Sequence, residues 1–232
     1  MKYQKIKKAV FKSRPNRFIA HVLVDGEPVV AHVKNTGRCH ELLIPGCTVY
    51  LSVSDNPDRK TKYDLVAVEK TVGYGQILMI NMDSQAPNAM VEEWLPISGL
   101  FSDRANIRRE MTYGNSRFDF YIEDGCRKCF LEVKGVTLEA DGVAMFPDAP
   151  TERGVKHITE LIQCMEDGYE AYILFVIQMT GVSVFRPNVA THPAFAEVLR
   201  AAQSAGVGLL AYDSIVTPDS ASIHAPIPID LT

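Results

Sequence analysis

The sequence lacks any apolar run long enough to cross a membrane. The longest such run extends from Ala171 to Ile177, whereas a transmembrane helix needs about 20 mostly apolar residues. Lysines are frequent at the start of the chain, but the apolar stretch of a secretory signal does not follow them. We therefore expect a cytoplasmic protein with no membrane partner.

Cysteines are few, and their number is odd. The five are scattered along the chain, which makes a poor disulfide framework and fits a reducing compartment. Cys126 and Cys129 form a CxxC pair that would suit half a zinc site or a redox pair. A zinc site needs two more ligands, and the sequence has no second CxxC and no HxxxH. Because strand-like runs flank the pair, we expect a plain hairpin turn.

Acidic residues are missing from the first 18 positions, which hold seven basic side chains. The overall charge of −4 argues against nucleic acid, but residues 1–80 hold 13 Lys and Arg against 7 Asp and Glu. Residues 81–232 hold 11 against 21. This asymmetry favours a polyanion-binding module joined to a unit with another task, although a solvated face is the alternative. The expected nucleic-acid contacts of the first module are Arg14, Arg17, Arg38, Arg59, Lys60 and Lys62.

The first part of the chain reads as all-β. Short strand-like runs separated by regular turn signals predict a small barrel. The runs cover residues 17–24, 28–33, 47–53, 62–71 and 76–81. A five-stranded OB-fold, whose face binds oligonucleotides or oligosaccharides, is the natural candidate. The pattern alone leaves an SH3-like barrel open.

The pattern changes near residue 82, where helical spacing first appears. Helices are expected at 87–95, 151–167 and 191–205, and strands at 107–113, 117–123, 129–136, 171–177 and 207–212. The order predicts an α/β unit with a mixed sheet. The whole chain is thus expected to be an α+β protein of two domains, residues 1–81 and 82–232.

One group of charged residues is suited to metal chemistry. Asp119 lies in an apolar run, and Glu132 and Lys134 lie in the next. Residues i and i+2 of a strand share a face, so Glu132 and Lys134 point the same way. If the two runs pair as a hairpin, Asp119 lies beside Glu132. Two carboxylates, assisted by the carbonyl of Val133, would suit Mg²⁺ or Mn²⁺, although a cross-strand salt bridge is the simpler interpretation.

The chain resembles the sugar fermentation stimulation protein family over nearly its whole length. The matching segments are Asn35-Thr36-Gly37-Arg38, Pro45-Gly46, Arg59-Lys60-Thr61-Lys62-Tyr63, Ser116-Arg117-Phe118-Asp119-Phe120, Glu132-Val133-Lys134-Gly135-Val136-Thr137-Leu138, Phe146-Pro147-Asp148-Ala149, Thr151-Glu152-Arg153-Gly154 and Lys156-His157. The resemblance implies an N-terminal OB-like barrel and a C-terminal restriction-endonuclease-like, PD-(D/E)xK domain. It also implies DNA binding and a role in regulating sugar (maltose) metabolism in bacteria. No proline precedes Asp119, as is common in divergent members of that nuclease superfamily.

Further site residues are expected from the two helices that flank these strands. The superfamily often adds an acid from the helix before the core strands, for which Glu93 is the candidate and Glu110 the rival. Arg153, Lys156 and His157 would hold a phosphate near the start of the later helix. The alternative interpretation is that each of these side chains belongs to a solvated surface.

Three functions compete on the sequence alone. The first is a DNA-binding phosphodiesterase in which Asp119, Glu132, Lys134 and Glu93 carry the chemistry. The second is a non-catalytic DNA-binding regulator that retains the nuclease fold. The third is an OB module for RNA or sugar on an α/β scaffold. The basic first domain favours nucleic acid, chiefly DNA with little sequence preference and RNA as the second candidate.

Overall fold

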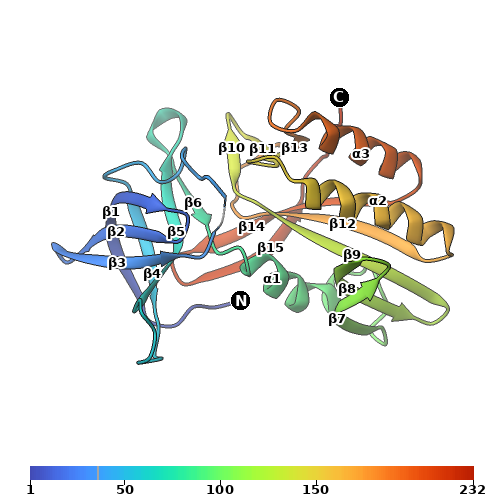
Figure 1. The fold of residues 1–232 in the computed structure, drawn as a ribbon, viewed down its shortest axis with the longest axis horizontal. Helices are drawn as coiled ribbons and strands as arrows, with labels where there is room; N and C mark the ends of the chain where they lie inside the picture. The colour runs from blue at the N-terminus through green and yellow to red at the C-terminus, as the bar shows by residue number, and fades with distance from the viewer. Residues whose placement is uncertain (36) are drawn as a thin grey trace.

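The computed structural model describes residues 1–35 and 37–232, so Thr36 lies outside the described residues. A β-barrel formed by the N-terminal part of the chain lies beside a larger α/β unit formed by the rest (Figure 1). The two-domain α+β architecture expected from the sequence is confirmed. In the described part of the chain, no helix is long and apolar enough to span a membrane.

Six strands build the first unit. They are β1 (Ile6–Asn16), β2 (Ile19–Val24), β3 (Glu27–Val33), β4 (Thr48–Val53), β5 (Tyr63–Thr71) and β6 (Ile77–Asn81), with a short 3₁₀ turn, η1, at Gly73–Gly75. The hydrogen-bonded order is β3-β2-β1-β4-β5-β6. A parallel pairing of β3 with β5 closes β1 to β5 into a ring of five strands. The result is the closed OB-like barrel expected from the sequence.

The membership of the ring differs from the sequence prediction. The prediction missed β1, and it counted β6 as a barrel strand, whereas β6 pairs only with β5 beyond the closure. Strand β1 turns only Ala9 and Phe11 fully inward, while its lysines point to solvent. Two buried positions in a lysine-rich segment give too weak an alternation for the sequence to indicate a strand.

The second unit contains a six-stranded mixed sheet. Its strands are β7 (Asn106–Tyr113), β8 (Ser116–Asp124), β9 (Arg127–Val136), β12 (Glu170–Ile177), β14 (Gly208–Thr217) and β15 (Ser220–Pro226). The order is β15-β14-β12-β9-β8-β7, with β9, β12 and β14 parallel. The turn between β8 and β9 contains Cys126, so the CxxC pair spans a hairpin as expected. All five cysteines are free thiols.

Helices cover both faces of this sheet. The helices are α1 (Ala86–Trp94), α2 (Glu152–Glu166) and α3 (Pro193–Ser204), and the 3₁₀ turn η2 (Leu95–Ile97) follows α1. Helices α2 and α3 lie on one face and α1 on the other (Figure 1). Thr151 caps α2, because its hydroxyl accepts the N–H of Gly154 at 3.0 Å. Gly168 ends the helical segment with φ +85°.

Four strands were missing from the prediction for this unit. Strands β10 (Leu138–Ala140), β11 (Val143–Phe146) and β13 (Val184–Pro187) form a small separate sheet. They are too short to show a period in sequence. Strand β15, at the edge of the main sheet, follows β14, which was expected to be the last strand. It consists largely of small and polar residues, which are weak strand formers.

The two units are joined by buried polar contacts as well as by the chain. Gln178, which directly follows β12, donates to the carbonyls of Asn81 (3.1 Å), the last residue of β6, and Asp83 (3.1 Å). Lys34 of the barrel donates to Asp83 Oδ2 at 2.6 Å. The first residues of the chain also lie with the second unit, since Tyr3 N–H donates to the carbonyl of Asp219. The expected boundary at 81/82 coincides with the end of β6, but residues 1–3 pair beyond it.

Candidate active site

The three charged residues singled out in the sequence meet in one cavity. Strands β8 and β9 pair with Phe120 opposite Leu131, which brings Asp119 next to Glu132. The N–H of Val133 donates to Asp119 Oδ2 at 2.8 Å. Asp119, Glu132, Val133 and Lys134 all line a cavity of about 220 Å³. The hairpin pairing that the sequence predicted is therefore present.

Glu132 is the most enclosed of these groups, with 3% of its surface exposed. Its Oε1 accepts from Lys134 Nζ and from His157 Nδ1, each at 2.5 Å. Burial acts to raise the pKa of Glu132, but the charge of Lys134 and the hydrogen bond from His157 outweigh it and hold the pKa below its ordinary value. The other oxygen, Oε2, is buried and has no hydrogen-bond partner among the described residues.

Asp119 is held by neutral donors. Its Oδ1 accepts from the Asn88 side chain at 2.8 Å, and its Oδ2 accepts from the main chain of Val133. Burial, followed by the negative charge of Glu132, raises the pKa of Asp119 above its ordinary value. The cavity therefore contains a carboxylate whose charge is only partly compensated, next to an unpartnered oxygen of Glu132.

Helix α2 contributes the support for Glu132. His157 is buried and donates from Nδ1, because Arg153 Nε–H donates to its Nε2 at 3.3 Å. His157, expected from the sequence to contact phosphate, is instead placed on a carboxylate. Arg153 and Arg117 line the mouth of the cavity and also a neighbouring hollow of about 510 Å³. Lys156 lines only that hollow and donates to the carbonyl of Asn115.

Neither of the acids proposed from the neighbouring elements joins the cavity. Glu93 is exposed and accepts from the N-terminal amine of Met1 at 2.6 Å. Glu110 is exposed and lies 3.4 Å from Arg117. Helix α1 instead provides Asn88. Its signal was the helical period, because Met90 and Val91 mark the inner face, and Asn88 lies one turn before Val91 on that face.

The donors present fit a hard divalent cation. Asp119 and Glu132 offer carboxylate oxygens, and the unpartnered Glu132 Oε2 supplies a lone pair that nothing else uses. No cluster of three or more His, Cys, Asp or Glu side chains suited to a metal occurs in the described residues. Mg²⁺ commonly uses only one or two carboxylates and takes its other ligands from water and substrate phosphates. A third protein ligand, the Val133 carbonyl, stays a prediction.

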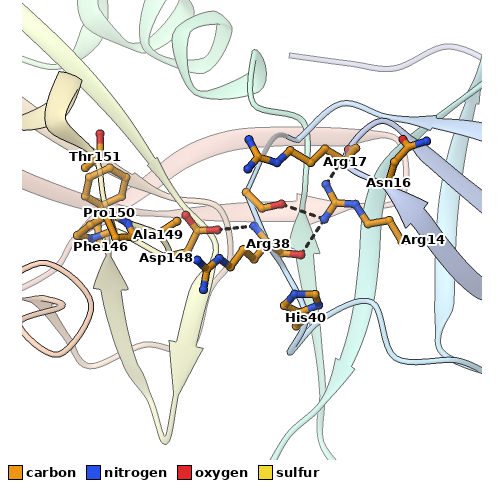
Figure 2. Close-up of a pocket in the computed structure, with 12 residues that line it drawn as sticks. Arg14, Asn16, Arg17, Arg38, His40, Phe146, Asp148, Ala149, Pro150 and Thr151 are labelled. Atoms are coloured by element: carbon orange, nitrogen blue, oxygen red, sulfur yellow. Dashed lines mark hydrogen bonds between the residues drawn. The ribbon is translucent and has the colours of Figure 1, made fainter.

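The basic residues of the barrel fall into two groups. Arg14, Arg17 and Arg38 lie at a cleft against the second unit (Figure 2). Arg59 lies elsewhere and is committed to Asp64, with contacts of 2.7 and 2.6 Å, whereas Lys60 and Lys62 are exposed. Arg59 therefore serves the barrel, and neither of the two lysines forms an ion pair with a residue that the structure describes.

Two family models match the chain, one for each unit. Residues 13–80 match the model described as "SfsA N-terminal OB domain". Residues 85–220 match the model described as "Sugar fermentation stimulation protein RE domain". The two matches leave only a short junction between them, at the place where β6 leads into α1.

Curated relatives and a solved structure agree with these matches. A sugar fermentation stimulation protein homolog of Desulfitobacterium hafniense is 57% identical over 220 residues, covering 95% of this chain and 94% of the relative. A homolog of Ruminiclostridium cellulolyticum is 53% identical over 231 residues, covering 100% of both. The structure described as Pyrococcus furiosus SfsA in complex with Ca²⁺ is 30% identical with a TM-score of 0.84, covering 99% of this chain and 98% of that one.

Proposed function

This chain belongs to the sugar fermentation stimulation protein family, and from that premise we propose that it binds DNA and hydrolyses phosphodiester bonds with a divalent metal. The observation that carries the proposal is the buried, unpartnered oxygen of Glu132 beside the incompletely compensated Asp119. A buried carboxylate oxygen without a donor is costly. A cation bound between the two carboxylates would reduce their mutual repulsion and would also give the buried Glu132 oxygen a partner.

Asp119 and Glu132 would hold Mg²⁺ or Mn²⁺. The related Pyrococcus furiosus protein is in complex with Ca²⁺, which supports a divalent cation for this chain as well. When bound, such an ion lowers the pKa of a coordinated water and stabilises charge on a phosphate. His157 and Arg153 keep the Glu132 carboxylate in place from the side of α2. Asn88 does the same for Asp119 from the side of α1.

Lys134 is the residue assigned to charge stabilisation. Its ammonium lies at the cavity, 14% exposed, and is fixed by the contact with Glu132 Oε1. From there it would orient the attacking water and stabilise the negative charge that grows on the phosphate in the transition state. Arg117 and Arg153 at the mouth would bind the flanking phosphates, because guanidinium groups match phosphate oxygens in geometry and charge.

The test is a cleavage assay on single- and double-stranded DNA and on RNA, with Mg²⁺, Mn²⁺ or EDTA. Wild type should cut at least one of these substrates with metal and none with EDTA. Asp119→Asn should be inactive because it loses a carboxylate of the metal site, whereas Glu93→Gln, an exposed acid outside the cavity, should cut normally.

The alternative is a non-catalytic DNA-binding regulator of sugar metabolism that retains the nuclease fold. The observation in its favour is that Glu132 Oε1 is already satisfied by Lys134 and His157 without a metal. Under this alternative, wild type binds DNA but cuts no substrate with either metal. Failure of cleavage in every arm of the assay, together with retained DNA binding, therefore decides for the regulator.

A further inference from the structure

A second cavity, apart from the Asp119–Glu132 site, lies between the two units. It measures about 590 Å³. The barrel contributes Arg14, Arg17, Arg38 and His40, and the second unit contributes residues 146–151, which precede α2 (Figure 2). We refer to it as the interdomain cleft. The mechanism proposed above makes no use of it.

Arg14 builds the barrel wall of the interdomain cleft. Its guanidinium donates to the carbonyls of Asn35 (2.7 Å), Arg17 (2.8 Å), Arg38 (2.8 Å) and Gly37 (2.9 Å). These contacts tie the turn after β1 to the loop after β3. The two terminal nitrogens of Arg14 are therefore used within the barrel, while its buried Nε–H has no partner among the described residues. Arg14 acts as a structural clamp, a role that differs from that of its two arginine neighbours.

The loop after β3 also holds the wall that the second unit contributes to the cleft. Asp148 Oδ2 accepts the N–H of Arg38 at 3.0 Å. A Cβ placed on Gly37 would lie 2.3 Å from that oxygen, so any larger residue here would have to displace the Asp148 side chain from this contact. The cleft is consequently formed in advance, and a ligand need not pay for assembling it.

Arg17 and Arg38 are the unused charges of the cleft. Both are exposed, and among the residues that the structure describes none forms an ion pair or a side-chain hydrogen bond with either guanidinium. Asp148 is the acid that lines the cleft against these arginines. The net charge of the cleft is therefore positive. Across from them lie Phe146 and Pro150 (Figure 2). Pro147 also lines the cleft. Cations facing an apolar wall suit a phosphate joined to a flat, weakly polar group.

Neighbouring residues at the start of α2 line the interdomain cleft and the candidate active site. Thr151, the cap of α2, lines the cleft, and Arg153, two residues later, lines the Asp119–Glu132 cavity. Arg153 and Arg117 then reach the hollow that contains Lys156. Basic side chains thus border three successive cavities around the first turns of α2, whose N–H groups add to the attraction for phosphates.

From this arrangement we propose that the interdomain cleft holds unpaired nucleotides of a strand whose next phosphates lie at the Asp119–Glu132 cavity. The substrate is then a single strand or a locally unpaired end, an inference that rests on the proposed function. The cleft has the size of a small-ligand pocket, so it admits nucleotides of one strand, whereas a duplex reaches only its rim. A positive groove with an apolar platform is the usual way in which proteins hold single strands.

The experiment measures binding without cleavage. Full-length protein carrying Asp119→Asn, in EDTA, is titrated against a fluorescent oligothymidylate and against a blunt hairpin duplex of equal charge. The test variant is Arg17→Ala/Arg38→Ala, and Arg17→Gln/Arg38→Gln keeps the side-chain bulk. The matched control is Lys60→Ala/Lys62→Ala, which removes the same charge from the barrel outside the cleft.

The cleft variants should bind oligothymidylate at least about tenfold more weakly, because each lost guanidinium removes a charge-assisted contact. The slope of log affinity against log salt should fall by about 1.4, or about 0.7 per phosphate contact. Duplex affinity should change less than about twofold. The lysine control should weaken both ligands alike.

Equal losses on the two ligands, or no loss on oligothymidylate, would overturn the inference even if the wild-type protein cuts DNA. Conversely, a wild type that binds oligothymidylate through Arg17 and Arg38 but never cuts any nucleic acid would refute the proposed hydrolysis and leave the inference standing. Thermal unfolding of each variant should match wild type, since both arginine side chains are exposed and Arg14 is untouched.

Discussion

The two carboxylates of the candidate site differ in how their charge is compensated. Glu132 faces the ammonium of Lys134 and the imidazole N–H of His157, and its pKa is held low. Asp119 has only an amide and a main-chain N–H as donors, and its pKa is raised by burial and by Glu132. Asp119 is therefore the residue that gains most from a cation and costs most without one.

Asp119→Asn should stabilise the metal-free protein while removing metal binding. A carboxylate whose folded pKa lies above its unfolded pKa destabilises the fold at neutral pH, and the cost disappears as pH falls through the folded pKa. Asparagine removes the charge, and the Asn88 amide can turn to accept from it. The midpoint of thermal unfolding in EDTA at pH 7 should rise, and calorimetry with Mn²⁺ should show binding in wild type only. A lower midpoint together with unchanged Mn²⁺ binding would contradict this assignment.

Arg59, expected from the sequence to contact nucleic acid, is paired in the structure with an acid of the barrel itself. Its bidentate contact with Asp64, which is 14% exposed, makes it part of the barrel. Arg59→Ala should lower the free energy of unfolding by about 1–2 kcal/mol at pH 7, because a largely buried carboxylate loses its charged donor. Lys60→Ala and Lys62→Ala should leave the stability unchanged and weaken DNA binding instead.

The effect of Arg59→Ala should depend on pH. Burial acts to raise the pKa of Asp64, but the hydrogen bonds from Arg59 and His32 outweigh it and hold the pKa low. The stability from this pair is present above the unfolded pKa, about 3.9, and is lost as pH falls through the folded value. Urea unfolding of wild type and Arg59→Ala should therefore converge below about pH 4. A constant difference across that range would refute the pairing.

Some site residues could be predicted from the sequence because they are local to one hairpin. A strand period of two and a single turn suffice to bring Asp119, Glu132 and Lys134 together. Asn88 and the actual partner of His157 could not be found in this way. Asn88 lies 31 residues before Asp119, and His157 lies 25 residues after Glu132, so only the tertiary packing of α1 and α2 on β9 and β8 decides what they touch.

At the scale of elements, strands and helices with a strong period were found, whereas short or weakly patterned strands were not. Helix α2 and strand β12 are long and regular, and both were predicted close to their observed bounds. Strand β1 was missed although it is central to the barrel, because the positions it buries are few and its outward face is charged. Register and closure depend on contacts between distant strands, which local patterns do not encode.

The packing of α1 on β9 positions Asn88, which donates to Asp119 in the candidate site. A Cβ on Gly135 of β9 would lie 2.7 Å from Pro87 Cγ and 2.7 Å from Gln178 Oε1. Gly135→Ala should therefore displace α1, lower the free energy of unfolding by about 1–3 kcal/mol, and weaken Mn²⁺ binding through Asn88. Gly73→Ala, where nothing lies within 4 Å of the added atom, is the control. Equal unfolding curves for the two variants would show that α1 is not held in this way.

At the scale of the whole molecule, the barrel and the sheet share one hydrophobic core. Buried residues of both units, such as Phe11 and Val33 with Phe175 and Phe185, belong to the same cluster. Lys70 of β5 crosses the junction to donate to Glu139 Oε2 and to the carbonyl of Glu139, each at 2.6 Å. The two units are therefore expected to unfold together, in a single calorimetric transition.

Removing only the cation of the Lys70–Glu139 pair should destabilise the fold, whereas replacing both residues by apolar ones should be tolerated. Lys70→Met leaves the buried Glu139, 5% exposed, without its cation and should cost about 3–5 kcal/mol. Lys70→Met/Glu139→Leu should recover most of that loss, because two apolar side chains leave no buried charge. Two resolved transitions in wild type, or a double variant no more stable than Lys70→Met, would argue against coupled units.

The cavity around Asp119, Glu132 and Lys134 is proposed to be the place where phosphodiester bonds are cut. The most direct test of this claim is the single-turnover cleavage rate of Lys134→Ala, measured in Mn²⁺ beside the DNA affinity of the same preparation. Lys128→Ala, an exposed lysine on the same strand, is the control. The rate of Lys134→Ala should fall by about 10²–10³ with DNA affinity within about twofold of wild type, because Lys134 acts mainly in the transition state. Cleavage by Lys134→Ala at the wild-type rate would contradict the claim.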